Sequence, residues 1–449
     1  FMGFFGLEEQ KLVAQFHEWQ TGAGLLYLEQ FQPQVGTVFT THATTVGRSM
    51  PENNQLLYSN LDKLNGDQKA RELNIISKHS LEKLASTNAD VFSTVSELTA
   101  RECLQFHERK IDVVLPNGFE DSFVPGEEEY PEKRKIARDR MLGVASRLCG
   151  ERIPDDAILL ATSGRYEFRN KGIDLFIDVL GTLNKSKGCK GTAVAFILIP
   201  ANHYGPRKDL IEALERDQET PFIEKYLTHN LHYVEHDQII SRIRENGLNN
   251  EKEDRVKVVF VPSYLNGNDG IFDLPYYDVL VGLDLTVFPS YYEPWGYTPL
   301  ESLAFSIPAI TTTLTGFGLW VDNTFEGEIR GLTLIPRDDF NDGEVIRQIS
   351  KVITDFCGLG PEEREALRKN AFEISRTALW SKMISHYWEA YSLALESASG
   401  KEGVHYEKGT HREAARNRTG AGGHSAPLEA CTYSAAYTGP VESSGRALP

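Results

Sequence analysis

The sequence predicts an α/β fold in which strands and helices alternate through two successive doubly wound halves, the first of them incomplete. Residues 193–199 form a continuous apolar run, typical of a central strand in a parallel sheet, and the valine-rich stretch 256–261 is expected to be a further strand. Next to such runs lie stretches with apolar residues at helical spacing, such as 172–184. The chain has 449 residues, of which 41% are hydrophobic and 25% charged, so it is long enough to bury two separate cores.

The first half runs over residues 1–150 and contains only part of a doubly wound domain. Its predicted elements are strands at 35–40 and 113–115 and a helix over 67–84. Residues 120–140 are rich in Glu, Pro, Lys and Arg. We expect this stretch to connect the first half to the second across a helix that ends near Gly150.

The second half covers residues 151–377 and is easier to interpret. Its predicted elements are strands at 157–162, 193–199, 256–261, 285–288 and 309–313 and helices at 172–184, 298–305 and 344–356. A polar, helix-prone insertion at 202–254 interrupts the alternation. A final amphipathic helix at 378–399 is expected to cross back to the first half. Residues 400–449 are rich in Gly, Ser and Ala, which predicts a disordered tail.

The net charge bears on the class of binding partner, and the cysteine content bears on the redox setting. The formal net charge of −17 argues against a nucleic-acid surface or an anionic membrane as partner. No apolar stretch is long enough to span a membrane. The five cysteines are Cys103, Cys149, Cys189, Cys357 and Cys431. They are far apart in sequence, with no Cys-x-x-Cys pair and no histidine spacing suited to zinc, so a reducing cytoplasm is the simplest setting.

The most specific segment of the chain is 289–301, Pro-Ser-Tyr-Tyr-Glu-Pro-Trp-Gly-Tyr-Thr-Pro-Leu-Glu, which follows the predicted strand at 285–288. Thr298, Pro299 and Glu301 match a capping box with proline at the first helical position, so a helix is predicted to begin there. A glycine-containing loop that leads into a helix start presents free backbone N–H groups and the positive end of a helix dipole. This arrangement predicts a phosphate site.

Four motifs in fixed order give a family resemblance. They are His17-Glu18-Trp19, then Thr40-Thr41-His42-Ala43-Thr44 through Gly47-Arg48, then Gly164-Arg165-Tyr166-Glu167 through Asn170-Lys171-Gly172, then Glu293-Pro294-Trp295-Gly296-Tyr297-Thr298-Pro299 with Glu301. Together they resemble the retaining glycogen synthases, family 3 glycosyltransferases, over most of the chain. The resemblance implies a GT-B fold of two facing Rossmann-like domains. It also implies transfer of glucose from a nucleotide sugar to the non-reducing end of an α-1,4-glucan such as glycogen.

The resemblance implies catalytic roles for five residues. Arg165 and Lys171 would grip the donor phosphates, and Arg48 would lie close to the leaving phosphate. No metal or other cofactor is implied, so cations and backbone amides must neutralise the pyrophosphate. Glu293 would hold a hydroxyl of the transferred glucose, and the backbone carbonyl of His42 would face the oxocarbenium-like centre. Taken alone, the loop cations could be solvated surface charges and the histidine a structural residue.

The resemblance also implies a set of substrate-binding residues. They are Trp295, Gly296, Tyr297 and Thr298 at the phosphates, Glu301 at the ribose hydroxyls, Tyr276 on the uracil, and His17, Glu18 and Trp19 in the cleft near the acceptor. Several of these have simpler explanations. Trp19 could be a buried tryptophan beside a hydrogen-bonded His17. Glu301 could serve only as the capping-box carboxylate, and Tyr276 could only pack a helix against the sheet.

Several functional questions stay open at this level. The implied donor is UDP-glucose, favoured by Tyr276, while ADP-glucose is an alternative. The enzymes of the family begin with a strand and a Lys-Val-Gly-Gly loop over the donor, and no such loop precedes Phe1, so we interpret the sequence as truncated. The alternatives are another GT-B transferase of the sucrose synthase or phosphorylase kind, or an inactive glucan-binding or subunit-association fragment. No lysine motif indicates the pyridoxal group of a phosphorylase.

Two expectations concern regulation and assembly. Residues 361–376 alternate arginine with glutamate, as ordinary surface helices do, and lack the dense arginine cluster of the animal and fungal enzymes. We therefore expect no activation by glucose 6-phosphate of the eukaryotic kind. The insertion at 202–254 could serve contacts between copies of the chain, which leaves a homo-oligomer open.

Overall fold

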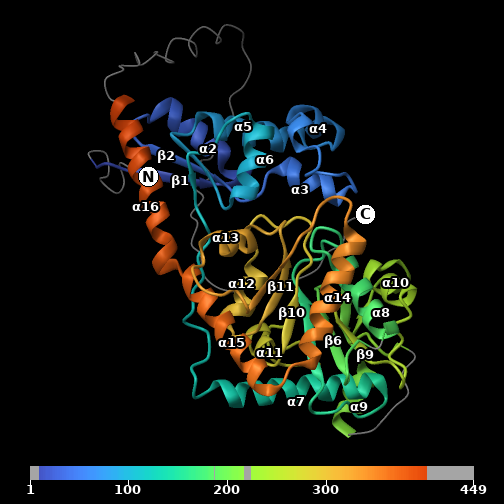
Figure 1. The fold of residues 1–449 in the computed structure, drawn as a ribbon. Helices are drawn as coiled ribbons and strands as arrows, with labels where there is room; N and C mark the ends of the chain where they lie inside the picture. The colour runs from blue at the N-terminus through green and yellow to red at the C-terminus, as the bar shows by residue number, and fades with distance from the viewer. Residues whose placement is uncertain (1–9, 187, 217–223, 402–449) are drawn as a thin grey trace, which may run out of the picture. The chain divides into compact units, whose positions relative to one another are not determined.

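The computed structural model describes residues 10–186, 188–216 and 224–401, and Figure 1 shows two parallel sheets flanked by helices. In the described part of the first half, four parallel strands pair in the order of the chain. They are β1 (Val13–His17), β2 (Gly36–Thr41), β3 (Val91–Thr94) and β4 (Val113–Val114). The helices between them are α2 (Glu18–Phe31), α3 (Thr45–Glu52), α4 (Gly66–Glu72), α5 (Ile76–Asn88) and α6 (Glu97–His107). The carboxyl ends of these strands therefore share one edge.

The prediction of one helix over 67–84 is wrong, because two helices, α4 and α5, cover this stretch. Asn74 lies between them with φ of 57°, a left-handed conformation that asparagine adopts more readily than most residues. The backbone N–H of Ile75 donates to the carbonyl of Ala70, which closes the end of α4. Apolar periodicity continues across the break, so the sequence pattern did not reveal it.

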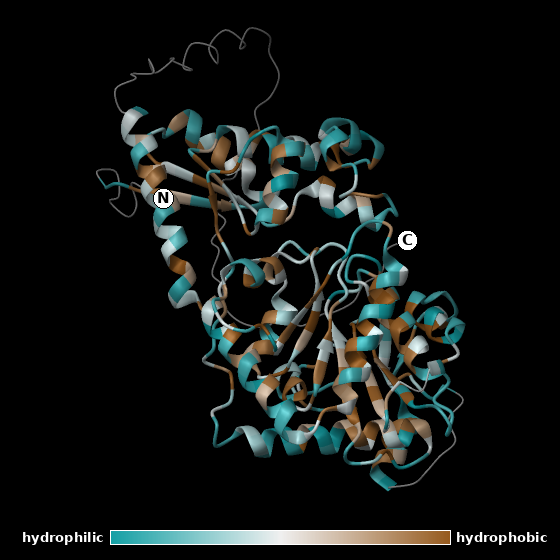
Figure 2. Ribbon diagram, in the orientation of Figure 1, coloured by the Kyte–Doolittle hydropathy of each residue, from teal (hydrophilic) through white to brown (hydrophobic). Residues whose placement is uncertain are grey.

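The second sheet has six parallel strands in the order β12-β11-β10-β5-β6-β9. They are β5 (Ile158–Ser163), β6 (Ala193–Leu198), β9 (Val256–Val261), β10 (Leu285–Val287), β11 (Ala309–Thr312) and β12 (Leu332–Ile335). The strand at 256–261 has the predicted bounds, whereas β12 was not predicted. Figure 2 shows hydrophobic residues concentrated on these strands, and β5, β6 and β9 are buried throughout.

The strand order reverses at β5, which pairs with β6 on one side and with β10 on the other. The chain builds outward from β5 through β6 to β9 and then returns to form β10 and the strands beyond it. In open parallel sheets, ligands bind at the carboxyl ends of the strands where the order reverses. The loops after β5 and β10 carry the Gly164–Gly172 and Glu293–Glu301 motifs, so the topology brings the two motifs together.

Helices cover the second sheet and lead back to the first (Figure 1). They are α7 (Tyr130–Cys149), α8 (Ile173–Ser186), α11 (Tyr276–Val281), α12 (Tyr297–Ala304), α13 (Gly316–Thr324), α14 (Asp342–Gly358), α15 (Pro361–Ser375) and α16 (Trp380–Lys401). α7 ends at Gly150 with φ of 68°, as the sequence predicts. α16 packs on β2, β3 and β4, and its Tyr391 hydroxyl donates to Gln15 Oε1 at 2.7 Å. The predicted tail at 400–449 lies almost wholly outside the described residues.

The insertion at 202–254 contains more than the predicted helices. α9 (Lys208–Arg216) and α10 (Gln238–Glu245) are accompanied by an antiparallel pair of short strands, β7 (His203–Pro206) and β8 (His229–Leu231). The buried Arg207 side chain donates to the carbonyl of Leu227 at 2.9 Å and to Asp209 at 2.7 Å, which ties the start of α9 to the approach to β8. Histidine, glycine and proline dominate β7, so its sequence does not resemble a strand.

Two further observations bear on the sequence-based expectations. Cys189 and Cys357 are paired as a disulfide that links the segment before β6 to the end of α14, whereas Cys103 and Cys149 are buried free thiols. A reducing setting does not predict that pair, and the separation of 168 residues hid it from the sequence pattern. Among the described residues, no helix has the length and apolar character needed to cross a membrane.

Candidate active site

The loops after β5 and β10 meet through an ion pair and two backbone hydrogen bonds. The Lys171 ammonium is paired with the Glu293 carboxylate, and both side chains are largely buried, with 14% and 12% exposed. The carbonyl of Asn170 accepts hydrogen bonds from the backbone N–H groups of Tyr291 and Tyr292 at 2.9 and 3.0 Å. Gly172 has φ of 67°, and a Cβ there would overlap the carbonyl of Pro289. The Asn-Lys-Gly motif thus fixes a close approach of the two loops.

The start of α12 differs from the predicted capping box. The helix begins at Tyr297 with Gly296 as its N-cap, and no side chain caps it. Gly296 has φ of 116°, and a Cβ there would come within 2.7 Å of Thr315. The prediction that Thr298 and Glu301 cap the helix is therefore wrong. The first backbone N–H groups of α12 have no side-chain acceptor from the cap, which leaves them free for an anion.

Glu301 serves a different contact. Its Oε1 accepts a hydrogen bond from the Tyr277 hydroxyl at 3.0 Å. Burial raises the pKa of Glu301 to about 7, although that hydrogen bond acts in the opposite direction. A buried carboxylate with one protein donor retains capacity to accept further hydrogen bonds, which fits the role of a ribose ligand implied by the resemblance.

Tyr276 and Tyr277, adjacent in α11, have different surroundings. The ring of Tyr277 stacks on Phe305 and on Phe123, with centroids 4.9 and 5.3 Å apart. The Tyr276 hydroxyl is within 2.8 Å of Ser163 Oγ at the end of β5. Because Tyr277 already stacks on two protein rings, Tyr276 is the better candidate for stacking on a donor base.

On the first sheet, a histidine pair lies at the ends of β1 and β2. His17 Nδ1 and His42 Nε2 are 2.9 Å apart, so they share one proton between them. Burial, followed by the charges of His17 and Arg48, lowers the pKa of His42 to about 4. His17 also has a pKa lowered by burial. Both rings are therefore neutral at pH 7, and the pair carries no charge of its own.

Glu18 holds the backbone of this pair in place. It begins α2 in a left-handed conformation, with φ of 64°, which is rare for a residue with a side chain and is found mostly where structure serves a site. Its Oε1 accepts a hydrogen bond from the backbone N–H of His42 at 2.9 Å. Burial and the charge of Glu82 raise the pKa of Glu18 to about 7. Trp19, the next residue, is half-buried and lies under the Lys78 ammonium, 5.6 Å from it.

Arg48 lies where the two halves approach each other. It is on α3, whose start is capped by Thr44, and its carbonyl accepts a hydrogen bond from Asn170 Nδ2 at 3.5 Å. Burial acts to lower the pKa of Arg48, but nearby acidic groups, among them Glu167, outweigh it and raise the pKa. Arg165 is 60% exposed and paired with Glu167 at 2.9 Å. Arg48 and Arg165 thus both interact electrostatically with the Glu167 carboxylate.

Sequence reasoning missed the buried contacts that support this site. The Glu102 carboxylate on α6 accepts hydrogen bonds from Thr44 Oγ1 at 2.7 Å and from the Tyr292 hydroxyl at 3.0 Å. The Tyr291 hydroxyl accepts from the backbone N–H of Leu57 at 3.1 Å and donates to Asp339. Tyr291 and Tyr292 precede Glu293, so two adjacent tyrosines beside a predicted site residue were the available signal.

Known proteins similar in sequence show the family of the chain. The family model described as glycogen synthase matches residues 2–217 and 206–445. The chain belongs to the glycogen synthase family. It is 31% identical to the glycogen [starch] synthase of Neurospora crassa over 89% of this chain and 65% of that protein, and 32% identical to the one from Caenorhabditis elegans over 86% and 66%. The chain therefore spans less than two thirds of the length of these relatives.

Solved structures confirm the fold of this glycogen synthase family member. Sucrose-phosphate synthase from Thermosynechococcus elongatus superposes with a TM-score of 0.52 and 16% identity, covering 88% of this chain and 77% of that one. The catalytic domain of starch synthase IV from Arabidopsis thaliana, bound to ADP and acarbose, gives 0.51 and 15%, covering 88% and 75%. Both are GT-B glycosyltransferases, so the predicted GT-B fold is confirmed.

Proposed function

We propose that this chain transfers glucose, with retention, from a nucleotide sugar to the non-reducing end of an α-1,4-glucan such as glycogen, with UDP-glucose favoured over ADP-glucose. The observation that carries the proposal is the buried Lys171–Glu293 pair beside the uncapped start of α12. It supplies a cation and free amides for a pyrophosphate and a carboxylate for the sugar. Membership of the glycogen synthase family supports the choice of substrates.

The proposed reaction breaks the bond between the anomeric carbon and the phosphate oxygen. The electron pair leaves with the nucleoside diphosphate, whose charge Lys171, Arg165 and the α12 amides offset. Positive charge develops at the anomeric carbon, close to Glu293 and the carbonyl of His42. The acceptor hydroxyl forms the new bond on the same face, and its proton passes to the departing phosphate oxygen. No step in this scheme calls for a metal or another cofactor.

Two parts of the sequence-based interpretation remain proposals. A cytoplasmic setting is supported by the free thiols of Cys103 and Cys149, while the Cys189–Cys357 pair points the other way. A homo-oligomer assembled through the insertion at 202–254 has no further support. Neither affects the chemistry proposed above.

The test is transfer of labelled glucose to glycogen by the purified chain, supplied with UDP-glucose or with ADP-glucose. Glu293→Gln should lower kcat by about 10²–10³, the usual cost of losing one group that stabilises the transition state. Glu373→Gln, which changes an exposed carboxylate on α15, is the matched control and should leave kcat unchanged.

Two results would replace the proposal. Sucrose formed from the same donors with fructose as acceptor, without labelling of glycogen, would assign a sucrose synthase-like activity. Retention on glycogen without transfer from either donor would make the chain a glucan-binding fragment.

A further inference from the structure

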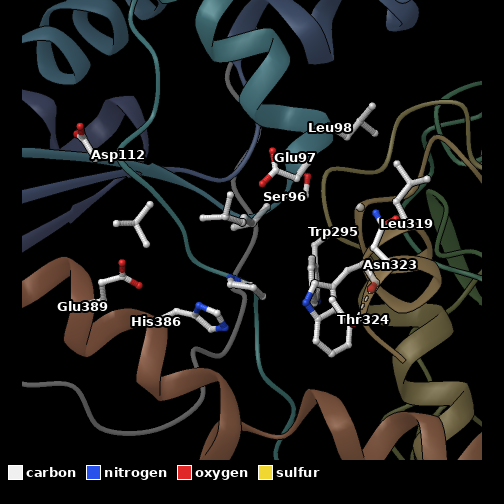
Figure 3. A pocket seen from close by; sticks show the side chains of 16 residues that line it. Ser96, Glu97, Leu98, Asp112, Trp295, Leu319, Asn323, Thr324, His386 and Glu389 are labelled. Carbon is white, nitrogen blue, oxygen red and sulfur yellow. Dashed lines mark hydrogen bonds between the residues drawn. The ribbon is translucent and has the colours of Figure 1, made fainter. Parts of the chain in front are cut away.

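A pocket of about 450 Å³ is lined on one side by Trp295, two residues after Glu293 (Figure 3). It is bordered by the turn from β3 into α6, by β4, by α13 and by α16. In Figure 3, His386 and Glu389 of α16 lie on the opposite side of the pocket from Trp295. No residue proposed above to act in catalysis lines it, and only Trp295 is shared with the predicted substrate-binding set.

The charge of the lining excludes an anionic ligand. Glu97, Asp112 and Glu389 all line the pocket, whereas no lysine or arginine does. Asp112 is already paired with Arg109 at 2.9 Å, but Glu97 and Glu389 are exposed and have no hydrogen-bond partner among the described residues. A nucleotide or sugar phosphate would meet like charge without a cation to offset it.

A metal ion fits no better. Within the described residues, the one group of His, Cys, Asp and Glu spaced closely enough to hold an ion is His79, Glu82 and His107, which is outside the pocket. The carboxylates of the pocket do not converge on a common point. They are therefore placed to accept separate hydrogen bonds.

The aromatic side chains of the lining provide an apolar surface and one unpaired hydrogen-bond donor, the indole N–H of Trp295. Trp295 and Trp320 lie with ring centroids 5.9 Å apart, and Trp320 also stacks on Phe317 at 6.2 Å. Trp295 is 3% exposed, and its Nε1 has no hydrogen-bond partner in the described structure. Buried indole N–H groups normally find an acceptor, because leaving one unpaired costs free energy. A ligand oxygen in the pocket would supply that acceptor.

We propose that this pocket is a subsite for a segment of the acceptor α-glucan. Sugar hydroxyls can accept from Trp295 Nε1 and donate to Glu97 and Glu389, while the C–H face of a glucose ring can lie on Trp320. A neutral polyol is not repelled by the acidic lining, and its hydroxyls can form hydrogen bonds with each of these unpaired groups. The proposal rests on the proposed function, since it identifies the ligand with the acceptor of that reaction.

The position of the pocket gives the subsite a role. The carbonyl of Trp295 accepts from the backbone N–H of Phe317 at 2.7 Å, and the carbonyl of Glu293 accepts from Gly316 at 3.0 Å. The loop of the site and the start of α13 are therefore tied together by backbone hydrogen bonds. A glucan segment held against α13 would keep the polymer next to the reacting centre and raise the local concentration of its chain ends.

The test measures glucan binding with no donor present. The purified chain is titrated with maltoheptaose by calorimetry, alongside Trp320→Ala and the double variant Glu97→Gln/Glu389→Gln. Trp320→Ala should weaken binding about five- to tenfold and the double variant about threefold. Trp388→Ala, which removes a 62% exposed indole of α16 outside the pocket, should bind as the parent chain does.

The outcomes separate the subsite from the proposed function. If the parent chain fails to bind maltoheptaose, or if Trp320→Ala and the double variant both bind it as the parent does, the subsite is refuted, whether or not transfer occurs. If Trp320→Ala does not fold, the surface double variant decides alone. Equal binding of cellohexaose, a β-linked glucan, would also overturn the assignment to α-glucan. Weakened binding in a chain that shows no transfer would uphold the glucan site while the proposed activity fails.

Discussion

The two halves of the molecule differ in the charged groups that they place at the proposed site. On the second half, Lys171 and Glu293 form a charged pair, with further cations close by. On the first half, the rings of His17 and His42 are neutral at pH 7, and Arg48 on α3 adds one cation. Glu18, which holds the backbone of His42, has a pKa raised by burial to about 7.

The difference shows how charge can be divided in a glycosyl transfer. The half that would hold the pyrophosphate must carry fixed positive charge, since that is where negative charge accumulates. The half that would face the developing oxocarbenium ion must not repel it, and neutral rings and a backbone carbonyl meet that need. The predictions below test groups on each half of the molecule in turn.

The largest effect is expected from removing the cation of the second half. Lys171→Met should lower kcat with UDP-glucose by about 10²–10³, because one preorganised charge is lost and Glu293 is left without its partner. Steady-state kinetics with glycogen as acceptor measure it. Lys185→Met, on the exposed end of α8, is the matched control. A loss below tenfold in Lys171→Met would show that phosphate charge is met elsewhere and would remove the contrast between the halves.

The next prediction concerns two buried carboxylates of the first half with opposite pKa shifts. Burial raises the pKa of Glu102 to about 7, despite hydrogen bonds from Thr44 and Tyr292. Burial acts in the same direction on Glu82, but hydrogen bonds from His107 and Thr45 prevail and lower its pKa. Folding therefore favours the protonated form of Glu102 and the ionised form of Glu82.

These shifts give opposite pH dependences of stability. Relative to Glu102→Gln, the parent chain should lose about 3 kcal/mol as pH rises from 4.5 to above 7, since the folded state binds the extra proton in that window. Relative to Glu82→Gln, the parent should be more stable above pH 4.5, and the advantage should fade as pH falls below it. Urea unfolding followed by tryptophan fluorescence measures both. The same sign in both pairs would contradict the assignment.

The parts of the fold that the sequence predicted are those specified locally. The strand at 256–261 follows from a valine-rich stretch, and the end of α7 follows from the glycine at its C-cap, Gly150. The four motifs identified the family. At Glu301 the local sequence pattern predicted a capping box, but the carboxylate accepts a hydrogen bond from the Tyr277 hydroxyl instead.

What could not be predicted depends on residues far apart in the chain. The hydrogen bond between Tyr292 and Glu102 joins residues 190 positions apart, and the sequence around Glu102 does not predict it. Trp320 has no neighbours in sequence that suggest a sugar site, and it acquires that setting only where α13 and α16 border one pocket. Periodicity describes one element at a time, so such constellations emerge only when the chain is folded.

The smallest expected effect lies at Tyr276 on α11, where a donor base would stack. Tyr276→Ala should raise KM for UDP-glucose about tenfold with little change in kcat, because a lost stacking contact is worth about 1–3 kcal/mol and acts equally on ground and transition states. Tyr277→Phe removes only the hydroxyl that binds Glu301 and retains the ring between Phe305 and Phe123, so KM should rise less than threefold. Initial rates over a range of donor concentrations measure both. The reverse order of effects would assign base binding to Tyr277 and would mean that its stacked aromatic partners separate when the donor binds.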